Sequence, residues 1–290
     1  MWTGWMLTSA VFLALYDISK KASVRRNSVL PVLLVSSASG TAVYAAVLAA
    51  AGAIPSLRSV SAVDFLLIAT KSVIVGTSWI LTYCALRTLP VTIATPIRAS
   101  APALVFLGAF FLYGERPTPV QGVGMLLVFV GYWMFGWAGR HEGIDFLRSR
   151  AVWYAVGGMV MSAVSSLWDK FLFQKRAVPV ETVQFWFQLV LVGIYALLLA
   201  VGALRRRGES SSFEWRWTIP LTGVLLVVAD WFYFRGLSIP DVSIAAGSLL
   251  RRFSVAITFV LGALFFGERN LRRKSIALAA TLVGIVLMCI

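Results

Sequence analysis

The segment LGAFFLYGER at residues 107–116 recurs as LGALFFGER at residues 261–269. Both copies are apolar runs that end in Gly-Glu-Arg, and residue 267 of the second corresponds to residue 114 of the first, an offset of 153. To within one residue the same offset aligns four further features: Tyr16-Asp17 with Trp168-Asp169, Trp79 with Trp231, Arg98 with Arg252, and Gly131 with Gly284. Residues 1–140 and 151–290 are therefore predicted to be two copies of one structural unit.

Both units are predicted to lie in a membrane. Of the 290 residues, 59% are hydrophobic and 13% are charged, whereas about 25% of the residues of a soluble protein are charged. Uncharged runs such as residues 29–57 and 183–204 can cross a bilayer core of about 30 Å, which takes a helix of about 20 residues. The composition excludes an ordinary soluble domain and indicates an all-α integral membrane protein.

Apolar runs between charge clusters and Pro or Gly predict ten crossing helices. Their expected positions are 2–19, 29–51, 63–86, 90–113, 119–138, 151–174, 180–204, 217–237, 240–266 and 271–290. Each unit then holds five helices. Because five is odd, the second unit enters the membrane from the opposite side, which gives an inverted repeat of the kind common in secondary transporters.

The formal net charge of +14 comes from an excess of Lys and Arg, and the distribution of these residues along the chain predicts how the protein is oriented in the membrane. The connections and helix ends after odd-numbered helices hold sixteen basic residues: Lys20, Lys21, Arg25, Arg26, Arg87, Arg140, Arg148, Arg150, Arg205, Arg206, Arg207, Arg216, Arg269, Arg272, Arg273 and Lys274. Those after even-numbered helices hold five: Arg58, Arg116, Lys175, Arg176 and Arg235. By the positive-inside rule the first side is cytoplasmic, and both termini lie outside.

The duplicated unit ending in Gly-Glu-Arg resembles the EamA domain of the drug/metabolite transporter superfamily along essentially the whole chain. Shorter stretches, among them Lys71-Ser72, Thr95-Pro96-Ile97-Arg98-Ala99 and Leu250-Arg251-Arg252, look like one bacterial branch. The resemblance implies a ten-helix metabolite carrier, often an exporter, in the bacterial inner membrane. It also implies cytoplasmic termini, against the count of basic residues, and it does not specify the cargo.

Charged residues deep in predicted helices are candidate site residues, because a charge in a bilayer costs several kcal/mol unless it is paired or faces water. The cations are Lys71, Arg98, Arg251 and Arg252, and the anion is Asp230. Since cations outnumber the anion, we expect a positive central cavity that binds a carboxylate or phosphate, with Arg98 and Arg251 or Arg252 forking to its oxygens. The alternative is structural: one cation pairs with Asp230 and another caps carbonyls freed by prolines.

Several other residues also have both a functional and a structural interpretation. Tyr16-Asp17 and Trp168-Asp169 could form gates or a proton-coupling site, or be charges at helix ends near water. Trp79 and Trp231 could wall a substrate pocket or pack ordinarily. Gln184 and Gln188, four residues apart on one helical face, could line the cavity or bond another helix.

The favoured function is alternating-access transport of a small anionic metabolite by one chain in a lipid bilayer, with a proton as a possible coupling ion. No cofactor, metal or nucleic acid is expected. An intramembrane enzyme is disfavoured because the single histidine, His141, lies in a polar loop. A channel and cation-drug efflux fit the duplication and the excess cations poorly. A flippase for a lipid-linked anionic headgroup is the remaining alternative.

Overall fold

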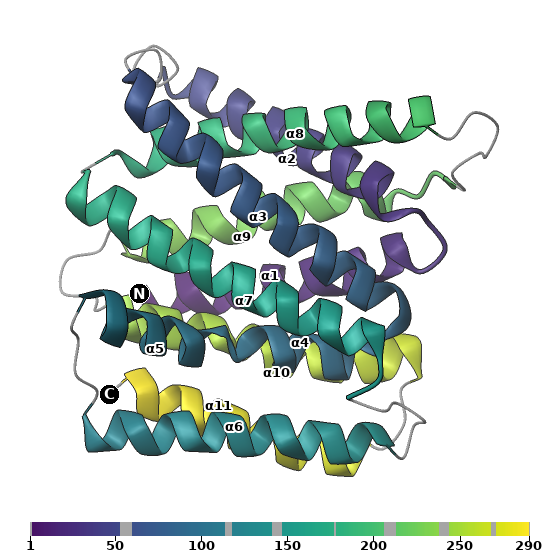
Figure 1. The fold of residues 1–290 in the computed structure, drawn as a ribbon, viewed down its shortest axis with the longest axis vertical. Coiled ribbons are helices and arrows are strands. Elements are labelled where there is room, and N and C mark those ends of the chain that lie inside the picture. Colours follow the sequence, from purple (N-terminus) through teal and green to yellow (C-terminus); the bar gives the residue numbers. More distant parts are fainter. Residues whose placement is uncertain are drawn as a thin grey trace.

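In a computed structural model of the chain, residues 2–52, 60–113, 118–140, 147–176, 178–205, 213–237, 244–267 and 271–289 are described. Their helices are α1 (Trp2–Val24), α2 (Val29–Ala50), α3 (Ala62–Thr88), α4 (Val91–Ala99), α5 (Ala101–Tyr113), α6 (Pro119–Arg140), α7 (Arg150–Lys170), α8 (Val180–Arg205), α9 (Thr218–Leu237), α10 (Ile244–Phe266) and α11 (Leu271–Cys289). A π-helical segment, η2 (Phe171–Lys175), continues α7. The fold is the expected all-α bundle of ten crossings, seen in Figure 1 as helices stacked side by side.

The predicted helix over 90–113 is divided into α4 and α5. Ser100 is the C-cap residue of α4, and its N–H donates hydrogen bonds to the carbonyls of Pro96 and Ile97. The nitrogen of Pro102 has no hydrogen to donate, so the hydrogen-bond ladder cannot run unbroken through this point. The prolines thus turn one apolar run into two consecutive helices.

The first helix is longer than predicted. The sequence placed its end at residue 19, whereas α1 continues to Val24 and includes Lys20 and Lys21, which are only 1% and 7% exposed. The cluster of lysines is therefore part of the helix and not of a loop.

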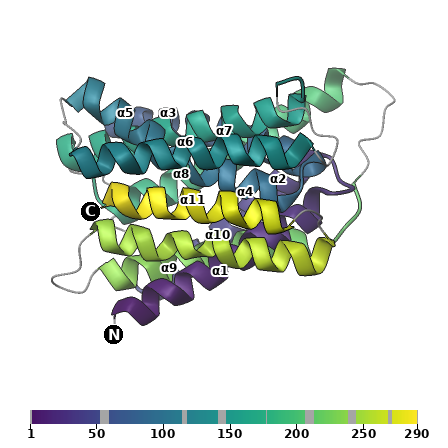
Figure 2. The ribbon, with the colours of Figure 1, turned by 90° about the horizontal axis from the view of Figure 1, so that it is seen from below.

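The helix contacts repeat under exchange of the two units, as an inverted repeat requires. The contact of α1 with α9 corresponds to that of α7 with α3, and the contact of α2 with α9 corresponds to that of α8 with α3. The α6 and α11 pair corresponds to itself. Both chain ends lie at one end of the bundle (Figures 1 and 2). The two units therefore pack around a pseudo-two-fold axis between them.

Two glycines matched by the repeat form the α6–α11 contact. A Cβ on Gly131 would overlap the hydroxyl of Thr281, and a Cβ on Gly284 would lie 2.8 Å from the backbone nitrogen of Val128. Only glycine allows these helices to approach so closely. The repeated Gly-Glu-Arg motif is also explained in part, since Gly267 has φ of +59° directly after α10, a conformation typical of a helix C-terminus.

Four helical stretches, α2, α3, residues 150–169 of α7, and residues 180–204 of α8, are by themselves long and apolar enough to cross a membrane, among the residues that are described. The other long helices have shorter apolar runs. The main buried core joins helix ends from both units around Val24, Leu86, Leu89, Val152 and Ile219. These residues flank four of the connections that follow odd-numbered predicted helices, so the described helix ends beside those connections lie at one end of the bundle, here called the basic end.

Candidate functional site

A cavity lies between the two units, enclosed by α1, α2 and α3 of the first and by α8 and α9 of the second. The space between its side chains is about 340 Å³ when the part open to solvent is counted, and the enclosed part has room for about one water molecule. Its walls are formed by Tyr16, Ser36, Ser37, Gly40, Trp79, Tyr83, Gln188, Leu191, Thr222, Gly223, Leu226 and Val227. Residues from both units therefore surround one central space.

Three of the predicted site residues line this cavity: Tyr16, Trp79 and Gln188. Gln184 is buried, 8% exposed, but is not part of the wall. Trp231 is 47% exposed and packs edge-on against Trp5, with ring centroids 5.9 Å apart, so it lies outside the cavity.

Asp17 is the centre of a buried ion cluster. One guanidinium nitrogen of Arg98 lies 2.8 Å and 2.6 Å from the two carboxylate oxygens of Asp17, and the ammonium of Lys20 lies 2.7 Å from one of them. The ammonium also lies 4.4 Å from the centre of the Tyr16 ring, close enough for a cation–π contact. Asp17 is 1% exposed. It does not lie near water at a helix end, because α1 continues for seven residues beyond it to Val24.

Asp169 has a cation from another helix as its partner. The ammonium of Lys71 lies 2.6 Å from Asp169 Oδ1 and 4.7 Å from the centre of the Phe187 ring. The neighbouring Trp168 donates its indole N–H to the carbonyl of Leu67 at 3.1 Å. The side chain of Lys170, the nearer lysine in sequence, lies outside the described residues.

The expected contact of Arg98 with an anionic cargo stays a prediction, and in this structure Arg98 contacts a carboxylate of the protein itself. Arg98 and Lys71 contact the carboxylates of Asp17 and Asp169, and neither lines the cavity. The side chains of Arg251 and Arg252 lie outside the described residues, and Asp230 is half-buried on α9 away from the cavity wall. The Lys71–Asp169 pair is neutral, whereas the cluster of Asp17, Arg98 and Lys20 has two cations for one carboxylate.

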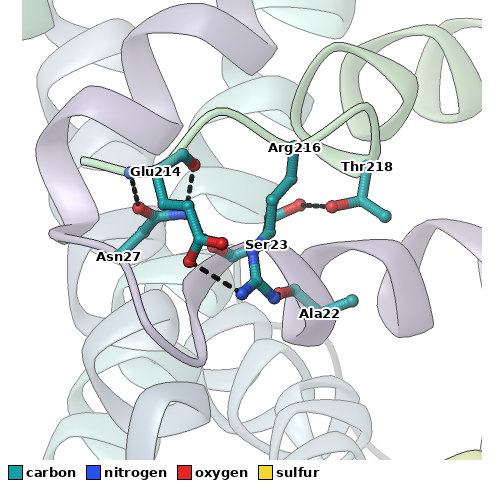
Figure 3. Close-up of polar contacts among 6 residues, drawn as sticks. All are labelled: Ala22, Ser23, Asn27, Glu214, Arg216 and Thr218. Atoms are coloured by element: carbon teal, nitrogen blue, oxygen red, sulfur yellow. Dashed lines mark hydrogen bonds and ion pairs between the residues drawn. The ribbon is translucent and has the colours of Figure 1, made fainter.

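Hydrogen bonds between α1 and the chain entering α9 close the basic end, as Figure 3 shows. The Asn27 amide donates to the carbonyl of Glu214 at 3.0 Å and accepts from its N–H at 2.6 Å. The Ser23 hydroxyl donates to Thr218 Oγ1 at 2.9 Å. Arg216 donates to the carbonyl of Ala22 at 3.3 Å. This network fastens the end of α1 to α9.

Lysines counted as loop charges complete the closure. The Lys21 ammonium donates to the carbonyls of Leu86 and Leu89 at the end of α3, at 2.5 Å and 2.6 Å. The Lys274 ammonium is buried in α11 and donates to the hydroxyl of Thr92 at the start of α4, at 2.9 Å. The polar spacing of Ser19, Ser23 and Asn27, four residues apart on one helical face, is the signal that would have indicated this interface.

The opposite end has its own ion pair. Two guanidinium nitrogens of Arg176, just after η2, donate to one carboxylate oxygen of Asp64 in the first turn of α3, at 3.0 Å and 2.8 Å. Asp64 also accepts the hydroxyl of Ser61, the residue that caps α3. Polar contacts thus join the two units at both ends of the cavity.

An inverted repeat of membrane helices around one central cavity is the arrangement found in many secondary transporters. The model of the EamA-like transporter family matches residues 1–137 and 149–290. The chain belongs to this family, and through it to the drug/metabolite transporter superfamily.

The fold is also similar to a solved structure described only as "Crystal structure of protein". The match covers 99% of this chain and 94% of that chain, with 19% sequence identity and a TM-score of 0.65. At this identity the likeness shows the fold alone. No curated protein matches the sequence significantly.

Proposed function

We propose that the chain carries a small polar metabolite across the bacterial inner membrane by alternating access, with the central cavity as its cargo site. The observation that carries the proposal is that residues of both units line one cavity and that polar contacts join the units at both of its ends. Rocking of one unit against the other would break the contacts at one end while keeping those at the other. One chain contains both units, so a monomer suffices.

The nature of the cargo follows from what faces the cavity. A carboxylate or phosphate cargo would have to reach the buried cluster of Asp17, Arg98 and Lys20, displace Asp169 from Lys71, or bind Arg251 or Arg252. Displacing a buried partner leaves an uncompensated charge, which costs several kcal/mol. The uncharged walls therefore favour a polar cargo that presents neutral groups to this cavity.

A cross-link at the basic end tests alternating access without knowledge of the cargo. In a chain with Cys84→Ser and Cys289→Ser, the pair Ser23→Cys and Thr218→Cys replaces hydroxyls 2.9 Å apart. A reporter, Leu226→Cys, lies in the cavity wall. After oxidation we expect a membrane-impermeant maleimide to label the reporter only from the end opposite the basic end, and reductant to restore labelling from both.

The matched control has the reporter but not the cysteine pair, and its labelling should not respond to oxidation. Labelling from the basic end that persists after complete cross-linking would contradict the mechanism. The disulfide would then hold the basic end together without blocking access from that end to the cavity.

We further propose that the basic end faces the cytoplasm, since it collects most of the basic residues near helix ends. A cysteine introduced at Ser210, between α8 and α9, is expected to react with an impermeant maleimide only after cells are permeabilised. Labelling in intact cells would reverse the orientation and place the termini in the cytoplasm.

A further inference from the structure

The cavity walls combine hydrogen-bonding groups with an absence of charge. Six of the twelve residues that line it carry a hydroxyl or amide: Tyr16, Ser36, Ser37, Tyr83, Gln188 and Thr222. No Asp, Glu, Lys or Arg is part of the wall as described. This composition is typical of a small-molecule pocket, in which apolar and aromatic surface surrounds a few oriented polar groups.

Two of the polar groups already have partners in the protein. The Ser36 hydroxyl donates to the carbonyl of Leu33 at 3.2 Å. The Thr222 hydroxyl donates to the carbonyl of Thr218 at 2.6 Å and lies 3.0 Å from the hydroxyl of Ser19. These groups hold the helices together and define the shape of the wall.

Two other atoms are buried without a hydrogen-bond partner among the described residues, namely Ser37 Oγ and Gln188 Oε1. Gln188 is 7% exposed and belongs to α8, whereas Ser37 belongs to α2 of the other unit. A buried polar atom left unpaired costs about 1–3 kcal/mol. One group from each unit is therefore left to bond whatever occupies the cavity.

The repeat places a glycine in the cavity wall at a position where the other unit has a charged residue. Residue 223 corresponds to residue 71 at an offset of 152, so Gly223 occupies in α9 the position that Lys71 occupies in α3. A Cβ at Gly223 would overlap the carbonyl oxygen of Ser36, so α2 leaves no space for a side chain there. At these equivalent positions, Lys71 contacts Asp169, whereas Gly223 lines the cavity and has no side chain.

We propose that this cavity, once widened by the rocking of the two units, binds a neutral, hydroxyl- or amide-bearing small molecule, such as a polyol or sugar, through Ser37 and Gln188 beside the indole of Trp79. The proposal rests on the transport function above and names its substrate class. The wall as described offers an ionised group no side chain of opposite charge, because the Lys20 ammonium lies against the rings of Tyr16 and Tyr83 and is not part of the wall. A site built to bond hydroxyls also discriminates strongly against analogues that lack them.

Binding to the purified protein in lipid nanodiscs tests the substrate class with matched probes. Glycerol, glucose and myo-inositol form the neutral set, and glycerate and gluconate are the acid counterparts of the first two. We expect at least one neutral probe to bind tenfold or more tightly than its acid, measured by calorimetric titration. Ser37→Ala and Gln188→Leu should each weaken that binding at least tenfold.

Ser39→Ala is the control on the same helix, because the Ser39 hydroxyl donates to the carbonyl of Val35 at 2.7 Å and does not line the cavity. The Ser39→Ala variant should bind the neutral probe with the same affinity as the unmodified protein. Without ligand, Ser37→Ala and Gln188→Leu should not lower the thermal midpoint, since the two atoms bond nothing in the protein. If Ser37 and Gln188 instead stabilised the fold, the substitutions would lower the thermal midpoint.

Tighter binding of the acids, no binding by either set, or binding that ignores both substitutions would each overturn the proposal. In the last case, the two groups would bond only water. The cross-linking result does not depend on the cargo, so alternating access could hold while the substrate class fails.

Discussion

Asp17→Asn is expected to lower the free energy of unfolding by about 3–5 kcal/mol, the range measured when one partner of a buried ion pair is removed. Asp17 is the only carboxylate that the structure shows in contact with Arg98 and Lys20, and both cations would be left facing each other in a buried site. The measurement is the thermal or denaturant midpoint of the purified protein in detergent, with the yield of monodisperse protein as a second readout.

The matched control is Asp64→Asn, which removes the carboxylate of the more exposed pair with Arg176. Exposed ion pairs contribute little, so this variant should remain close to the unmodified protein. The double variant Asp17→Asn, Arg98→Gln should recover part of the loss, because it removes the stranded charge as well. Equal stability of Asp17→Asn and Asp64→Asn would refute the buried cluster.

Gly223→Ala is expected to disrupt the α2–α9 contact and to cost about 3 kcal/mol, the upper end of the usual overpacking range. The added Cβ would overlap the carbonyl oxygen of Ser36 and lie 2.8 Å from the nitrogen of Gly40. Because these are backbone atoms, a rotamer change cannot relieve the clash, and the helices must separate beside the cavity. A lower thermal midpoint would be the direct readout.

Gly193→Ala provides the control with the same chemical change in another helix. A Cβ on Gly193 would meet no atom within 4 Å. Since alanine favours helix over glycine by about 1 kcal/mol, this variant should be as stable as the unmodified protein or more so. If the two variants behave alike, close approach at Gly223 does not determine the packing.

The helices and the repeat could be predicted because both depend on patterns along the chain. Apolar runs located the crossings, and the 153-residue offset matched Gly131 with Gly284, which the structure places in one helix contact. The end of α1 was predicted wrongly at residue 19. Lysines usually mark a loop at the membrane surface, but Lys21 bonds carbonyls at the end of α3, and no local pattern reveals such a distant acceptor.

The ion pairs illustrate the same limit. Asp17 and Arg98 are 81 residues apart, and the lysine that contacts Asp169 comes from α3 of the other unit. The sequence indicated that these charges would be costly alone but could not assign the partners, because pairing depends on which helix faces meet. The sequence does align Lys71 with Gly223, at an offset of 152 residues.

The pairing of buried charges also bears on how membrane voltage acts on this carrier. Moving one elementary charge through 100 mV changes the energy by about 2.3 kcal/mol. Lys71 and Asp169 form a neutral pair, and a pair that moves as a unit carries no net charge through the field. The membrane potential would therefore do no net work on this pair when the two side chains move together.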